Sequence, residues 1–189
     1  PAATQRDTGH LDPLHPLCAS SRGFVPLFDG EFATALHDMQ PLQQSSEQGS
    51  SPFVVSFAWI HAANDDMAEV DRLIDTFGED RPGHVMGELM SFLRSAWRGE
   101  GVQALTCVTE RLETAARWDD LYSLFMADGY ALVGDLDRAL FWLDHAIDYG
   151  ISNVPFLSGH DPFLAPLRSD ERFAGLLDKA SRVSESITS

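Results

Sequence analysis

The chain has 189 residues, an ordinary apolar fraction and a formal net charge of −16, so it is long enough for one domain with a hydrophobic core. The negative charge argues against direct nucleic-acid binding and against binding to an anionic membrane surface, because phosphate contacts need clustered lysines and arginines. No apolar run approaches the roughly 20 residues that insert into a bilayer, and the two cysteines form no disulfide framework, which favours reduced thiols and a cytoplasmic location.

Apolar residues recur at intervals of three and four along successive segments, which predicts helices with one buried face. No segment shows the alternation of a strand over a useful length. In chain order, the predicted segments are a linker or the end of an upstream repeat at 1–16, a helical hairpin at 17–42, a polar loop at 43–51, hairpins at 52–78, 83–117 and 119–149, a C-terminal cap at 161–183 and a tail at 184–189.

Each hairpin is predicted as two helices joined by a short turn. In the fourth hairpin, Asp119 or Asp120 is expected to cap the first helix, because a carboxylate there accepts hydrogen bonds from free backbone N–H groups. Gly134 is expected to end that helix, since glycine adopts the left-handed conformation without a Cβ clash. The predicted helix pairs are 17–28 with 31–42, 52–63 with 66–77, 83–98 with 101–116, and 119–133 with a helix that begins near Leu136.

The cap at 161–183 combines an apolar side with a charged side. A stacked array of hairpins leaves the flank of its last hairpin exposed, so we expect this segment to cover it. Asp170 is expected to cap its final helix. The apolar side consists of Phe163, Leu164, Leu167, Phe173, Leu176 and Leu177.

A spacing of 35 residues relates neighbouring hairpins, in which a turn glycine is followed five residues later by an alanine. A fixed period of this size indicates a repeat architecture and makes an enzyme unexpected. The alanines mark points where two helices must approach closely. The recurring pairs are Gly30 and Ala35, Gly99 and Ala104, and Gly134 and Ala139, with Asn64 and Glu69 in the same positions of the second hairpin.

With an aromatic residue before the glycine and a further small residue after the alanine, this pattern resembles the tetratricopeptide repeat (TPR) family; Tyr130, Gly134, Ala139 and Ala146 carry it in full. The resemblance implies an all-α fold, a right-handed α-solenoid of about four TPR-like hairpins with a C-terminal capping helix. Residues 142–173 also resemble the end of the C-terminal TPR region of large bacterial signalling proteins, in which a kinase, cyclase or winged-helix domain precedes the repeats. Because no initiator methionine precedes Pro1, we interpret the chain as a fragment of a longer protein.

In the TPR family the contact positions lie on the first helix of each hairpin, along the concave surface of the array. The side chains at these positions are mostly apolar, and none is Lys, Arg or Asn. We therefore expect an apolar helix or extended peptide as partner, rather than a bound terminal carboxylate. The predicted partner-binding groove consists of Phe24, Val55, His61, Met90, Leu93, Trp97, Leu121, Phe125 and Asp128. The competing interpretation is that Leu89, Leu93, Trp97 and Phe125 are core residues between hairpins.

No motif for catalysis, for a cofactor or for a metal stands out. The histidines do not pair at metal-ligand spacing, and neither a Gly-rich phosphate loop nor a Gly-x-Ser-x-Gly elbow occurs. We expect a non-catalytic protein–protein interaction module without cofactor, whose partner is a separate protein or another part of the same parent chain. Two alternatives stay open: a ligand-responsive sensor domain that regulates an attached effector domain, and assembly through self-association.

Overall fold

The computed structural model describes residues 23–46 and 53–187. Within those ranges every regular element is helical and no strand occurs, which confirms the all-α prediction. After a helical turn at 23–28, the elements are α2 (Phe32–Ser46), α3 (Val54–Ala63), α4 (Met67–Asp80), α5 (Val85–Trp97), α6 (Gly101–Thr106), α7 (Glu110–Ala116), α8 (Asp120–Leu132), α9 (Leu136–Asp148), a π-helical turn η1 (Phe156–His160), a 3-10 turn η2 (Ala165–Ser169) and α10 (Glu171–Ile187).

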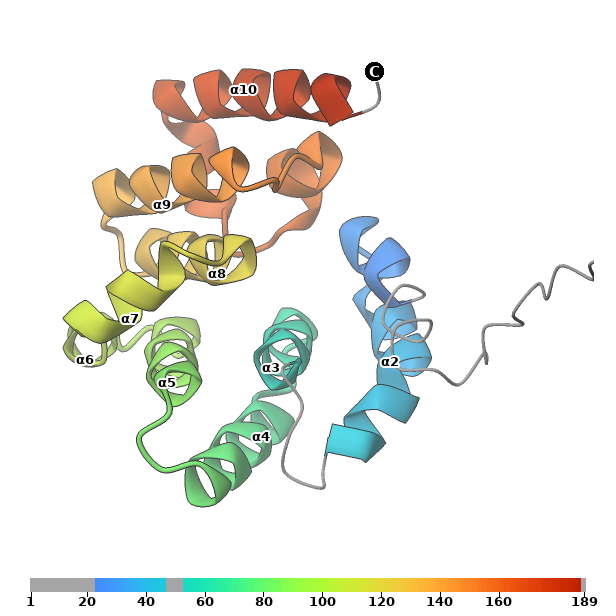
Figure 1. The fold of residues 1–189 in the computed structure, drawn as a ribbon, viewed down its shortest axis with the longest axis vertical. Helices are drawn as coiled ribbons and strands as arrows, with labels where there is room; N and C mark the ends of the chain where they lie inside the picture. The colour runs from blue at the N-terminus through green and yellow to red at the C-terminus, as the bar shows by residue number, and fades with distance from the viewer. Residues whose placement is uncertain (1–22, 47–52, 188–189) are drawn as a thin grey trace, which may run out of the picture.

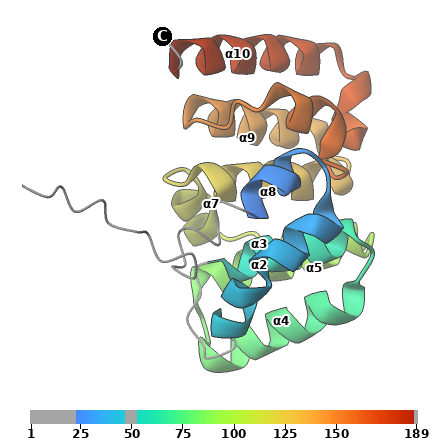
Figure 2. The same ribbon diagram turned by 90° about the vertical axis from the view of Figure 1, so that its right-hand side faces the viewer.

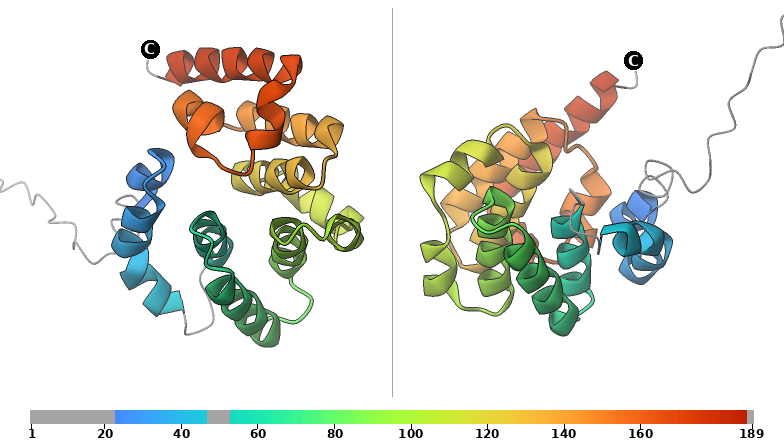
Figure 3. Two further views of the ribbon diagram at one scale, coloured as in Figure 1. Left: turned by 180° about the vertical axis from the view of Figure 1, so that it is seen from behind. Right: turned by 60° about the horizontal axis from the view of Figure 1, so that its bottom comes forward.

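The helices follow one another around the molecule in chain order, and most of them pack on their neighbour in the chain (Figure 1). The pairs α3–α4 and α8–α9 are in contact, and α5 packs against both α6 and α7. The first helices of successive pairs also touch, α3 with α5 and α5 with α8. Viewed from behind, α3 lies between α2 and α5 (Figure 3), and from the side α10, α9 and α8 form successive layers (Figure 2).

Local signals fix the ends of the helices in the fourth pair. The Asp119 side chain accepts a hydrogen bond from the backbone N–H of Tyr122 at 2.8 Å, as expected for a capping carboxylate. Asp135 caps α9 in the same way through the backbone N–H of Arg138. Gly134, between the two helices, has φ +83°, a conformation that is strained for residues with a Cβ.

One geometric unit recurs along the chain: a turn residue with positive φ, followed five residues later by a side chain with no exposed surface. The glycines of the three Gly/Ala pairs have φ between +73° and +83°, and their alanines are fully buried. In the second hairpin the predicted positions of this unit were wrong by one residue. The positive φ (+60°) belongs to Asp65 and not to Asn64, and the buried residue is Val70 and not Glu69. The corrected turn positions are 30, 65, 99 and 134, spaced by 35, 34 and 35 residues.

The structure differs from the predicted helices in two places. The stretch 101–116 is not one helix, because Thr109 leaves the helical conformation and its hydroxyl caps α7 by accepting from the N–H of Leu112 at 3.1 Å. Threonine bonds its own backbone readily in this way and competes with helix continuation. Helix α2 runs to Ser46, into the predicted polar loop at 43–51, since its glutamines are good helix formers.

Parts of the predicted segmentation lie outside the described residues, namely the linker at 1–16, the start of the first hairpin and the end of the loop at 43–51. Helix α10 extends to Ile187 and therefore includes most of the predicted tail at 184–189. None of the helices in the described ranges is both long and apolar enough for a transmembrane span.

The predicted cap divides into two parts with different roles. Helix α10 packs against α9, with Phe173 and Ala180 buried, and Asp170 caps it by accepting from the N–H of Arg172 at 2.9 Å, as predicted. Of the preceding residues, η2 packs against both α8 and α9, the helices of the last hairpin. The ring of Phe163, by contrast, reaches α3 and α5, where its centroid lies 5.1 Å from that of Trp59 and 5.6 Å from that of Trp97.

Candidate functional site

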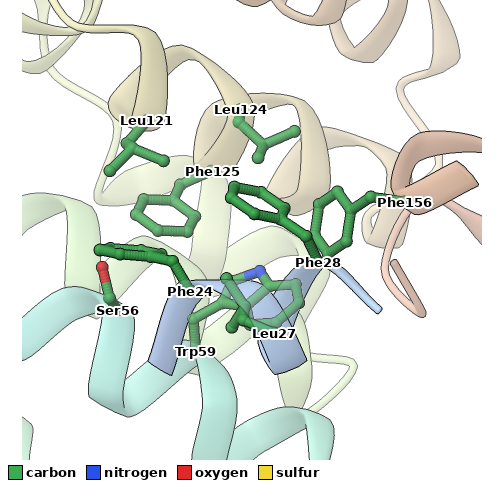
Figure 4. A pocket seen from close by; sticks show the side chains of 9 residues that line it. All are labelled: Phe24, Leu27, Phe28, Ser56, Trp59, Leu121, Leu124, Phe125 and Phe156. Carbon is green, nitrogen blue, oxygen red and sulfur yellow. The ribbon is translucent and has the colours of Figure 1, made fainter. Parts of the chain in front are cut away.

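An apolar pocket lies where the 23–28 turn faces α3, α8 and η1 (Figure 4). Its cavity volume is about 20 Å³, enough for little more than one water molecule. We call its α3 and α8 side the inner face, formed by Ser56, Trp59, Leu121, Leu124 and Phe125. The remaining lining residues are Phe24, Leu27, Phe28 and Phe156. The inner face is thus covered by other residues of the same chain.

The 23–28 turn contacts the inner face through one side of its helix. Phe24, Leu27 and Phe28 stand at positions i, i+3 and i+4, which share a helical face. Val25 lies on the opposite side and is 64% exposed. The Phe28 ring meets that of Phe156 edge to face at a centroid distance of 5.1 Å, within the range of attractive aromatic pairs.

Gly30 fixes where the turn ends and how closely it approaches η1. Its φ of +78° favours glycine, and a Cβ built there would lie only 2.6 Å from Nδ1 of His160. The chain leaves the turn through backbone hydrogen bonds of its own, from the N–H of Gly30 to the carbonyl of Leu27 and from that of Glu31 to Pro26. A side chain at position 30 would be strained by the positive φ and would force either the His160 side chain or the turn to shift.

Beside the pocket, a buried polar cluster links three parts of the chain. The indole N–H of Trp59 on α3 donates to Oδ2 of Asp128 on α8 at 2.7 Å. Asp161, just after η1, is also fully buried and accepts from the backbone N–H of Phe163 at 2.9 Å. Asp128 and Asp161 face each other, and the second oxygen of each finds no donor other than the opposing carboxyl group.

Burial raises the pKa of both carboxyl groups, since the charged form loses its hydration. For Asp128, burial and then the charge of Asp161 place the pKa well above its ordinary value. For Asp161, burial raises the pKa to about 7, although backbone N–H groups and Arg168 oppose the shift. The two carboxyl groups therefore titrate as a pair, with pKa values above the ordinary range of aspartate.

The structure divides the predicted groove residues into separate groups. Phe24, Leu121 and Phe125 do meet around the pocket. Val55, Met90 and Leu93 are at most 2% exposed, so the prediction that they line an open groove is wrong. They are buried because α3, α5 and α8 pack directly on one another.

The other predicted residues have distinct environments. Asp128 is buried beneath the pocket with Trp59, and it offers no surface to a partner. His61 lies at the end of α3, with Nδ1 3.1 Å from Oδ2 of Asp66. Trp97 is half-buried against Phe163. The competing interpretation as core residues is confirmed for Leu89, Leu93 and Phe125.

Sequence reasoning missed the residues that close the site. Phe28 and Trp59 stand one helical turn from Phe24 and Val55, so the same face of each helix could have included them. Phe156, Asp161 and the residues after them were assigned to the flank of the last hairpin or left without a role. One signal could have exposed Asp128, because it lies in an apolar stretch with no lysine or arginine close in sequence.

In the part of the chain that the structure describes, no three His, Cys, Asp or Glu side chains gather as metal ligands. The two buried carboxyl groups bond to each other, to Trp59 and to backbone, away from solvent. Comparison with protein-family models, curated proteins and solved structures finds no match to the chain. The TPR resemblance therefore stays a prediction.

Proposed function

We propose that the chain is a non-catalytic protein–protein interaction module that binds an apolar helix on its inner face. On this proposal it is a right-handed solenoid of TPR-like hairpins, and it belongs to the C-terminal region of a larger bacterial signalling or regulatory protein. The recurring unit of a positive-φ turn and a buried residue five positions later supports the repeat architecture. Its spacing of 34–35 residues agrees with the 34-residue period of TPRs.

The proposal depends mainly on one observation: a short helix of the same chain, at 23–28, already packs on the inner face. The 23–28 turn inserts Phe24, Leu27 and Phe28 against α3 and α8, the pattern by which an amphipathic helix binds an apolar groove. Aromatic anchors of this kind supply most of the binding free energy in helix-in-groove complexes. The same face is therefore suited in chemistry and curvature to a partner helix.

A small-molecule sensor finds no support at this site. Pockets for metabolites have volumes of roughly 300–1,000 Å³, whereas the cavity beside the inner face measures about 20 Å³. Its lining contains one hydroxyl group, from Ser56, among apolar side chains, so few polar groups could orient a metabolite. Binding of a helix requires an apolar surface for its side chains and does not require a large closed cavity.

Methyl-resolved NMR of the full chain tests the proposal. A synthetic peptide with the sequence of residues 20–31 is titrated as the probe, and a peptide with alanine at the positions of Phe24, Leu27 and Phe28 is the control. We expect saturable shifts of the Leu121 and Leu124 methyl groups with the first peptide only, while Leu112, buried in α7, stays unchanged. Equal responses to the two peptides, or none to either, would exclude a helix-binding inner face.

A further inference from the structure

The structure assigns to residues 23–28 the role of an intramolecular competitor for the inner face. The external partner is then an amphipathic helix that carries the same three anchors, an aromatic, an apolar and an aromatic residue at i, i+3 and i+4. Unlike the turn, this helix is flanked by basic residues. This inference rests on the proposed function and specifies its partner and its regulation. The partner must displace the turn before it binds, so the module is partly closed in its free state.

The packing of the 23–28 turn indicates that another helix can take its place on the inner face. Phe24 and Phe28 are only half-buried, although α3 and η1 lie beside them. The turn therefore rests on the inner face through side chains that solvent still reaches. A partner helix could replace the same three anchors.

The turn also bridges elements that are far apart along the chain. It contacts α3, the next first helix of the array, and also α8 and η1 near the other end. Its backbone hydrogen bonds are internal, from the N–H groups of Asp29, Gly30 and Glu31 back to residues 25–27. Release of the turn therefore breaks side-chain contacts with α3, α8 and η1 and leaves the internal hydrogen bonds intact.

Charge determines the flanks of the partner helix. The chain carries a net charge of −16, and Asp29 and Glu31 directly follow the turn and are exposed. Like charges next to the apolar anchors slow association, while lysines or arginines there speed the encounter. A partner with basic flanks thus has an advantage over the acidic turn that it replaces.

Fluorescence anisotropy of the full chain tests the competition. The labelled probe carries the sequence of residues 20–31, with lysine at the positions of Asp29 and Glu31. Four proteins are compared. The variant Phe24→Ala/Phe28→Ala removes the anchors of the competitor, and Gly30→Ala strains the positive-φ position at which the turn ends. Wild type is the reference, and Gly175→Ala is the control, because its Cβ would meet nothing within 4 Å. Thermal unfolding checks that each protein is folded. If the double variant Phe24→Ala/Phe28→Ala is unfolded, the comparison of wild type with Gly30→Ala provides the test.

If the turn occupies the site for about nine-tenths of the time, emptying it raises the apparent affinity about tenfold. We expect that gain for both turn variants, wild-type affinity for Gly175→Ala, and weaker binding to all four proteins when the probe lacks its lysines. Equal affinity of wild type and both turn variants would overturn the competition and leave the proposed function standing. No binding by any variant would overturn both. A wild-type dimer in sedimentation that the double variant lacks would also overturn it, since a second copy would then be the occupant.

Discussion

The indole N–H of Trp59 donates to Oδ2 of Asp128 at 2.7 Å, across 69 residues of sequence. This bond ties α3 to α8, the two helices that form the inner face. Asp161 stands against Asp128 and holds the segment after η1 in the same place. The cluster therefore fixes the geometry of the surface on which the 23–28 turn lies.

Stability should decrease with rising pH because of this carboxyl pair. In the folded state burial raises the pKa of Asp161 to about 7 and that of Asp128 well above its ordinary value, whereas an unfolded aspartate has a pKa of about 3.9. Between these values the folded state binds more protons, so each added pH unit reduces the free energy of unfolding by up to about 1.4 kcal/mol per group. The stabilisation is complete below about pH 4 and is lost as pH rises through 7.

Urea denaturation between about pH 5 and pH 8 measures this dependence. The control is the double variant Asp128→Asn/Asp161→Asn, in which neither side chain titrates. Its free energy of unfolding should change less with pH than that of wild type over this range. Parallel curves for the two proteins would mean that the pair does not hold a proton in the folded state.

Replacing Asp128 with asparagine should lower the free energy of unfolding only slightly, whereas replacing it with alanine should lower it much more. The side-chain amide introduced by Asp128→Asn keeps an acceptor for the Trp59 indole and a donor toward Asp161, so we expect stability within about 1 kcal/mol of wild type at neutral pH. Asp128→Ala leaves two buried groups without partners, each costing about 1–3 kcal/mol. Chemical denaturation checks both values, with the exposed Asp80→Ala, expected within about 0.5 kcal/mol, as control.

The contact between α5 and α8 requires glycine at position 129. A Cβ built on Gly129 would overlap the ring of Phe92, which has no exposed surface and no free space to move into. Gly129→Ala should cost about 1–3 kcal/mol through overpacking. Gly175→Ala, within α10 and with open space around it, should instead stabilise by up to about 1 kcal/mol. Opposite shifts in melting temperature are expected, and two shifts of the same sign would contradict this packing.

Local signals in the sequence predicted the helices well. Asp119 and Gly134 act on neighbouring backbone groups, so their roles can be inferred from a few residues, and the structure confirms both. The separation of α6 from α7 was missed because the apolar stripe continues through Val108 and Leu112, while α6 ends at Thr106 and the hydroxyl of Thr109 caps the start of α7. A periodicity argument weighs apolar residues and does not register such a hydrogen bond.

Most residues of the site could not be predicted, because they are brought together by contacts between segments that are far apart in the sequence. Met90 and Leu93 occupy first-helix positions but are buried, because direct packing of α5 on α3 and α8 leaves no open surface there. The pairing of Asp128 with Asp161, and of Phe28 with Phe156, joins segments that only the folded topology brings together. Phe24, Leu121 and Phe125 were placed together correctly since their helices were assigned to the same side of the array.

Intermolecular NOEs test most directly whether a partner helix lies between α3 and α8. The measurement uses the Gly30→Ala chain, in which the end of the turn is strained, and the lysine-flanked peptide with the sequence of residues 20–31. We predict NOEs from the aromatic rings of the peptide to the methyl groups of Leu121 and Leu124 on the inner face. NOEs instead to Val102 and Leu105, which are exposed on α6, would contradict a binding site at the inner face.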